Sequence, residues 1–152
     1  MDRDHFYITL FSTASQDVYP DNKIAAFTIQ LAKPVTLDPS EIWEVGLCEL
    51  SYSATQQLAN MSDFTNALVY CDLIAPQFMG TAMVRYLRIF DIMPADYDSE
   101  YLFENVYYVP VEKRTFRDIR IEILNLSRER IAFRDSKTPL KAVLHFRRVV
   151  TH

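Results

Sequence analysis

Three histidines are the first side chains to consider as acid–base groups or metal ligands. His5 lies in a charged N-terminal stretch and His152 is the last residue, so we expect both to be solvated. His145 alternates with Val143 and Arg147, and it is either a general base or a strand histidine hydrogen-bonded to a neighbour. We favour the hydrogen-bonded histidine. No second histidine or cysteine lies at metal-ligand spacing, so the sequence predicts no zinc site.

Acidic residues gather once, in the segment PADYDSEYLFEN. Spacing by two places Asp96, Asp98 and Glu100 on one side of an extended loop, and Glu104 follows. Such carboxylates are adequate for a weak Ca²⁺ site, but the glycine and the long ligand pattern of a dedicated loop are missing. A solvated acidic loop is the favoured interpretation. Because no serine sits on a glycine-flanked elbow and no nucleophile stands at readable spacing from a base, the sequence predicts no enzyme and no cofactor.

Basic residues recur on three of the predicted strands in an otherwise acidic chain. The chain has 16 basic and 20 acidic residues, a net charge of −4, which is the wrong sign for binding nucleic acid by phosphate neutralisation. The basic residues either form one face for nucleic acid or an acidic partner, or pair with acids on neighbouring strands; we favour the pairing. They are Lys113, Arg114, Arg117, Arg120, Arg128, Arg130, Arg134, Arg147 and Arg148.

Glycine is scarce, with only Gly46 and Gly80 among 152 residues. Average usage would give roughly 11 in a chain of this length. Phosphate-binding loops need several glycines, so nucleotide-binding loops of the Walker and dinucleotide types are excluded. A glycine inside a strand marks a bulge or a close approach of another backbone, which is the expectation for Gly46. We expect these two positions to tolerate alanine worst.

The elements that must position these residues are short, alternating apolar runs separated by turn residues. Hydrophobic residues make up 49% of the chain and aromatic residues 13%, and the length fits one domain over residues 1–152. Helical periodicity is weak, with a turn or two possible around Ser62 and between Tyr97 and Tyr101. About eight antiparallel strands predict an all-β fold, a single jelly-roll sandwich of two sheets. The expected strands are 6–11, 27–31, 43–52, 68–74, 85–92, 106–111, 116–124 and 142–149, with a short one at 131–133.

The N-terminal segment and the cysteines indicate where the protein is synthesised and whether its thiols are free. No stretch approaches the 18 or more apolar residues of a membrane span, so no membrane insertion is expected. The start MDRDHFYITLF lacks the basic beginning and long apolar segment of a signal peptide, which predicts synthesis in the cell interior. Cys48 and Cys71 lie in apolar runs and are expected to be buried free thiols.

Several segments of the sequence are distinctive in their individual residues and not only in their alternation of apolar and polar positions. FYITLFSTASQDVYPDNKIAAFTIQLAKPVTL resembles the opening of the minor capsid, or penton, proteins of Polinton/Maverick elements and related adintoviruses. WEVGLCELSY resembles the next strand of that family, VYCDLIAPQFMGTAMVRYLRIF its central segment and VLHFRR its terminal strand. The matching positions are Trp43, Glu44, Val45, Gly46, Leu47, Glu49, Tyr70, Cys71, Asp72, Gly80, Leu87, Arg88, Leu144, His145, Phe146 and Arg147.

The resemblance implies a virion protein that forms pentamers at the five-fold vertices of an icosahedral particle. It also implies a double-jelly-roll major capsid protein as partner, and fold-specifying or subunit-contact roles for the matching residues. Aromatic residues and Met concentrate at the centres of interfaces, although each is also a candidate for the core. The candidate subunit contacts are Phe78, Met79, Met83, Tyr107 and Tyr108.

Two other functions remain open at this point. A β-sandwich module for glycans or peptides would use Trp43, Tyr97, Tyr101 and Tyr107 as an exposed stacking platform. A hydrolase or oxygenase on a jelly-roll scaffold would need His145 beside another metal ligand.

Overall fold

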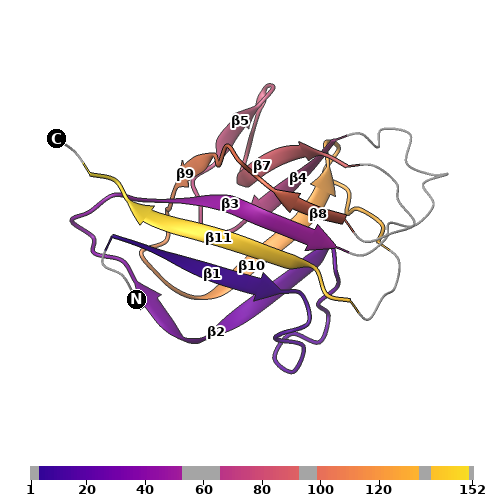
Figure 1. Cartoon of the computed structure of the whole chain (residues 1–152), viewed down its shortest axis with the longest axis horizontal. Helices are drawn as coiled ribbons and strands as arrows, with labels where there is room; N and C mark the ends of the chain where they lie inside the picture. Colours follow the sequence, from indigo (N-terminus) through magenta and orange to yellow (C-terminus); the bar gives the residue numbers. More distant parts are fainter. Residues whose placement is uncertain (1–3, 53–65, 93–98, 134–137, 151–152) are drawn as a thin grey trace.

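Two antiparallel sheets pack face to face in the computed structural model, which describes residues 4–52, 66–92, 99–133 and 138–150 (Figure 1). Within these ranges no helix is present, and so none that could cross a membrane. The first sheet has the order β1 (His5–Phe11), β11 (Lys141–Arg148), β3 (Trp43–Tyr52) and β8 (Ser99–Leu102), and β9 (Tyr108–Pro110) also pairs with β3. The second has the order β2 (Ala26–Thr36), β10 (Thr115–Asn125), β4 (Asn66–Cys71) and β7 (Tyr86–Asp91). A separate hairpin joins β5 (Gln77–Met79) to β6 (Ala82–Val84).

The order of the strands is that of a jelly roll. The chain places β1, β3, β8, β9 and β11 in the first sheet and β2, β4, β7 and β10 in the second, so it crosses repeatedly between sheets. Strands β8 and β9 both pair with β3 and act as one interrupted strand, which leaves four strand positions in each sheet. Eight antiparallel strands wound across two sheets are the jelly-roll arrangement, and the predicted fold class is confirmed.

The strand boundaries differ from the predicted ones where local pattern is a poor guide. Strand β2 continues past Leu31 through Pro34, which an edge strand tolerates because its outer N–H groups have no ladder partner. The predicted strand 68–74 ends at Cys71, and the predicted strand 106–111 shrinks to Tyr108–Pro110, with a single bridge at Val111. Residues 131–133 form no named strand; the nearby bridge joins Leu124 to Arg130.

Three short strands were missing from the expectation. Strands β5 and β6 have three residues each, too few to show alternation, and they lie on either side of Gly80. Strand β8 mixes Glu100 with Tyr101 and falls in the segment read as an acidic loop. The possible turn around Ser62, together with Asp96, Tyr97, Asp98, Arg134 and His152, lies outside the described residues.

The core lies between the two sheets and is filled by the inward faces of the alternating runs. Ile119, Ile121 and Ile123 of β10 are fully buried, as their alternation with charged residues predicts. Phe146 of β11 stacks on Phe6 of the same sheet, with ring centroids 4.8 Å apart, and lies 5.8 Å from Phe116 of the second sheet. An aromatic contact therefore joins the two layers.

Both glycines have a structural reason. A Cβ atom on Gly46 would overlap the Val106 side chain and would lie 2.8 Å from the carbonyl oxygen of Tyr107, so another backbone approaches β3 here, as expected. Gly80 has φ +60° at the tip of the β5–β6 hairpin, a conformation that side chains disfavour, although no atom crowds the position.

Both cysteines are free thiols. Cys71 is fully buried, and burial raises the pKa of its thiol to about 12. Cys48 is only half-buried, so the prediction of a buried thiol is wrong for this residue. Partial burial still raises its pKa, and neither thiol is activated as a nucleophile.

Candidate functional site

The two most specific strings of the sequence lie side by side in the middle of the first sheet. Strand β11 pairs with β3 in a register that sets His145 opposite Gly46 and Arg147 opposite Glu44. Alternation then divides the strings between two surfaces. The core receives Trp43, Val45, Leu47, Leu144 and Phe146, whereas Glu44, His145 and Arg147 lie on the outer face of the sheet.

The central string positions groups that tie the second sheet together. The carboxylate of Asp72 accepts a hydrogen bond of 2.9 Å from the backbone N–H of Arg120 and one of 3.2 Å from Lys113 Nζ. These contacts fix the end of β4 against β10. Cys71 and Leu87 lie in the core, while Tyr70 packs against a smaller apolar cluster of Leu68, Val84 and Leu124.

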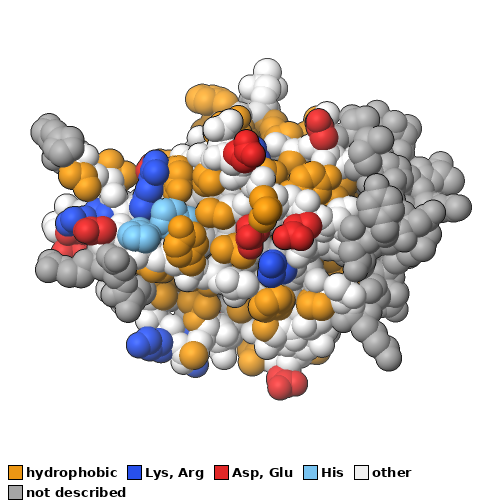
Figure 2. All heavy atoms as spheres, viewed as in Figure 1, with side chains coloured by type: hydrophobic (Ala, Val, Ile, Leu, Met, Phe, Trp, Pro, Cys, Tyr) orange, Lys and Arg blue, Asp and Glu red, His pale blue; other side chains and the backbone are white. Residues whose placement is uncertain are grey.

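A cluster of rings on the outer face of the first sheet centres on His145. Its Nδ1 is 2.8 Å from the hydroxyl of Tyr108, its Nε2 is 3.1 Å from His5 Nδ1, and its ring stacks on Tyr7 with centroids 4.4 Å apart. The guanidinium of Arg147 lies over the Tyr108 ring and pairs with Glu44. Figure 2 shows this face, with the histidines and a basic side chain together at one end. Both imidazole nitrogens of His145 are therefore engaged by neighbours.

The geometry supports the interpretation of His145 as a hydrogen-bonded strand histidine. His5, expected to be solvated, is exposed but lies against His145, and the pairing of the first strand with the last brings the two together. No local pattern predicts this contact, because 140 residues separate the two histidines. The described residues contain no group of three or more His, Cys, Asp or Glu suited to a metal ion. The two exposed acids Glu100 and Glu104 belong to no such group.

We expect the histidine cluster to make the fold less stable in acid. Burial, the nearby His5 and Arg147 together lower the pKa of His145 below its usual value, so the folded protein binds a proton there more weakly than the unfolded chain. The contribution of His145 to the free energy of unfolding is therefore complete above the unfolded pKa of about 6.5. It decreases as the pH drops through that value. The loss in Tm between about pH 7.5 and about pH 5.5 should be smaller in His145→Gln than in the unmodified protein. Equal losses by thermal unfolding would contradict this assignment.

Arg88 is held between two aromatic rings at the edge where β7 meets the β8–β9 segment. Its guanidinium carbon lies 4.0 Å from the centroid of Phe103 and 4.6 Å from that of Tyr107. Its Nη1 donates to the carbonyl of Asn105 at 2.6 Å, and burial lowers its pKa. Arg88 therefore joins β7 to the chain between β8 and β9 and orders Tyr107 on the surface. Sequence reasoning missed this role because Phe103 carries no local signal for it.

The candidate subunit contacts gather near the same edge, and they differ in exposure. Phe78 is 76% exposed, Tyr107 61% and Met83 50%. Met79 packs on the small apolar cluster under the hairpin, and Tyr108 is half-buried against His145. Three of the five candidates thus present apolar surface to solvent, which is where a contact between subunits would need it.

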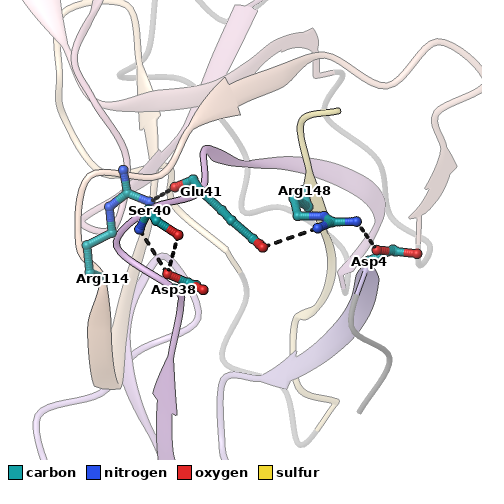
Figure 3. Close-up of polar contacts among 6 residues, drawn as sticks. All are labelled: Asp4, Asp38, Ser40, Glu41, Arg114 and Arg148. Atoms are coloured by element: carbon teal, nitrogen blue, oxygen red, sulfur yellow. Dashed lines mark hydrogen bonds and ion pairs between the residues drawn. The ribbon is translucent and has the colours of Figure 1, made fainter. Parts of the chain in front are cut away.

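Four of the basic residues named above, Lys113, Arg130, Arg147 and Arg148, pair with acids on other segments, as favoured, whereas Arg120 pairs within its own strand and Arg114 and Arg117 donate to backbone carbonyls. Arg148 contacts the carboxylates of both Glu41 and Asp4, and Arg114 donates to the backbone carbonyl of Glu41 (Figure 3). Asp38 closes the same loop by accepting hydrogen bonds from the backbone and hydroxyl of Ser40. This network joins the start of β1, the end of β11 and the β2–β3 loop. Other pairs are Arg120–Glu122, Arg130–Glu122, Lys113–Asp72 and Lys141–Glu49.

The platform required by the glycan-binding alternative does not form from its described members. Trp43 is only 5% exposed and lies in the core, where its ring contacts Phe6. Tyr101 is half-buried and donates to the backbone carbonyl of Asp91. Only Tyr107 among them is well exposed, so these residues do not line one sheet face.

The arrangement of the strands is shared with a protein of known structure. No protein-family model matches the chain, and no curated protein does so. Among solved structures the chain is similar to the crystal structure of the selenomethionine-labelled mavirus penton protein, with a TM-score of 0.65 and 7% sequence identity. The match covers 95% of this chain and 100% of that chain. At this level of identity the likeness shows that the two proteins share their fold from end to end.

Proposed function

We propose that this chain is a structural, non-enzymatic protein of an icosahedral virus particle. It is a penton, five copies of which close a vertex and border a double-jelly-roll major capsid protein. The observation that carries the proposal is the likeness to the mavirus penton protein over 95% of this chain and all of that one, with no large part of either left over. The ordered sequence resemblance to penton proteins of Polinton/Maverick elements supports the same role.

The surface of the chain also supports an assembled state. Phe78, Met83 and Tyr107 expose large apolar side chains near one edge of the sandwich. Exposed apolar patches on soluble proteins mark sites of contact with other molecules. In a ring of five copies, such an edge is covered by the neighbouring subunit.

Native mass spectrometry of the purified protein at rising concentration tests this proposal. The expected species is a pentamer of about 89 kDa, five times the 17.8 kDa chain, in equilibrium with the monomer. A protein that stays monomeric up to the highest soluble concentration would contradict the penton assignment. A glycan array probed with the same preparation should return no binders, whereas a specific binder would favour the glycan-binding module.

A further inference from the structure

The β5–β6 hairpin presents an uncharged apolar surface to solvent. Residues 76–84, PQFMGTAMV, contain no charged side chain in a protein in which 24% of residues are charged. Phe78 and Met83 are opposite each other in the hairpin register and share its exposed face. A two-stranded ribbon is marginally stable alone, and an exposed aromatic–Met pair is an unfavourable surface in water. The hairpin thus has a face that association would cover.

The other face of the hairpin packs against the second sheet, so the face with Phe78 and Met83 is held toward solvent. Met79, Ala82 and Val84 pack on the small apolar cluster that includes Leu68 and Leu124 of the second sheet. The hydroxyl of Tyr86 donates to the backbone carbonyl of Phe78 at 2.9 Å. These contacts hold the hairpin against β4 and β7, and Figure 1 shows it projecting beyond the strands of the sandwich. Phe78 and Met83 are therefore held outward on a supported element.

An apolar groove lies between the edge strands β1 and β2. It is a shallow, open depression with a volume of about 340 Å³. Hydrophobic side chains, with a basic one nearby, lie along this edge in Figure 2. The residues that line it are Phe6, Tyr7 and Ile8 of β1 and Leu31, Ala32, Lys33 and Val35 of β2.

The hairpin and the groove occupy opposite edges of the sandwich. Strands β1 and β2 begin their sheets, whereas β7 ends the second sheet and β8 the first. Figure 1 shows the hairpin above β7 and β9, with β1 and β2 on the opposite side. A protrusion on one edge that fits a groove on the other makes a head-to-tail contact, and such contacts close into rings when the rotation allows it.

The two edges of the sandwich carry exposed charges of opposite sign. Lys33 lies in the groove, and Arg117 reaches the same edge because its Nε donates to the carbonyl of Leu31 at 3.1 Å. The opposite edge carries the exposed acids Asp91, Glu100 and Glu104 along β7, β8 and the segment after β8. Arg85, which follows the hairpin directly, pairs with Glu112. Opposite charges facing each other across an interface orient the partners and exclude the reversed pairing.

We propose that the β5–β6 hairpin of one copy inserts Phe78 and Met83 into the β1–β2 groove of the next copy. The occupant of the groove is a second molecule of this chain, and each copy gives a hairpin and receives one. This contact rests on the proposed function, because it is the lateral contact of the ring. The proposal assigns the hairpin as the inserted surface and the groove as the receiving surface. The similarity in fold to the mavirus penton protein does not identify either surface.

Cysteine cross-linking between two differently substituted chains tests the direction of the contact. One chain carries Phe78→Cys and the other Ala32→Cys, both in a Cys48→Ser background; Ala32 is exposed in the groove, and Cys71 is buried. Under mild oxidation the mixture should give a covalent dimer that neither chain gives alone. Dimers formed by the Phe78→Cys chain alone would overturn the proposal, because they would show hairpins meeting each other.

A second set of variants tests whether the contact holds the ring together. Phe78→Ser with Met83→Ser, and separately Ala32→Glu, should weaken association at least about tenfold by native mass spectrometry. Leu126→Ser is the matched control, because Leu126 is 43% exposed in the turn after β10 and lies on neither surface, and it should leave association unchanged. If the pentamer forms and survives the hairpin and groove substitutions, this contact is wrong and the proposed function stands. If no pentamer forms at all, both are wrong.

Discussion

Gly46→Ala is expected to lower the free energy of unfolding by about 3 kcal/mol, the upper end of the usual cost of overpacking a core. The added Cβ overlaps the Val106 side chain, which can move, but it also lies 2.8 Å from the Tyr107 carbonyl oxygen, which belongs to the backbone. Relief requires β9 to move away from β3. The expected fall in Tm is roughly 6–12 °C, measured by thermal unfolding together with urea denaturation.

Gly80→Ala is the matched control, because it tests conformation without crowding. A Cβ there meets no atom within 4 Å, but φ is +60°. The expected cost is about 1 kcal/mol, and Gly80→Asn should cost less because Asn tolerates this conformation. Wild-type stability in Gly46→Ala would contradict the close approach of the segment before β9 to β3.

Phe146→Ala is expected to cost about 3–5 kcal/mol, the range for removing a buried aromatic ring. Phe146 is fully buried and contacts Phe6 and Phe116, so its removal opens a cavity between the two sheets. Urea denaturation should show a lower midpoint, and the slope should stay unchanged if the chain still unfolds in two states. Because the loss is large, the variant should also accumulate less soluble protein.

Phe78→Ala provides the contrast, since it removes the same atoms from an exposed position. Phe78 is 76% exposed, and surface substitutions usually change stability by less than about 0.5 kcal/mol. Comparable destabilisation by Phe146→Ala and Phe78→Ala would contradict the placement of the hairpin outside the core. The pair therefore separates a residue that holds the fold from one proposed to act only between subunits.

The architecture was predictable from sequence where alternation is local and uninterrupted. The isoleucines of β10 alternate with Asp118, Arg120 and Glu122, and a period of two residues identifies both the strand and its buried face. The jelly-roll topology was predicted from the number of alternating apolar runs and from the family resemblance. Strand pairing itself leaves no local trace, so the contact of His5 with His145 appeared only in the structure.

The candidate site was predictable in part, for a physical reason. Interface and core share a preference for aromatic residues and Met, so composition selected Phe78 and Met83 without deciding between the two environments. The exposed fractions of the side chains distinguish the two environments. Phe78 and Met83 are exposed, whereas Trp43, a candidate for a stacking platform, lies in the core. The receiving groove arises from two strands about 25 residues apart in the chain, and no motif marks it.

Negative-stain electron microscopy of the concentrated, purified protein tests the central claim most directly. The penton assignment predicts class averages of rings with five-fold symmetry. The size of each ring should fit five chains of 17.8 kDa. Particles of single-chain size only, or rings of another symmetry, would contradict it.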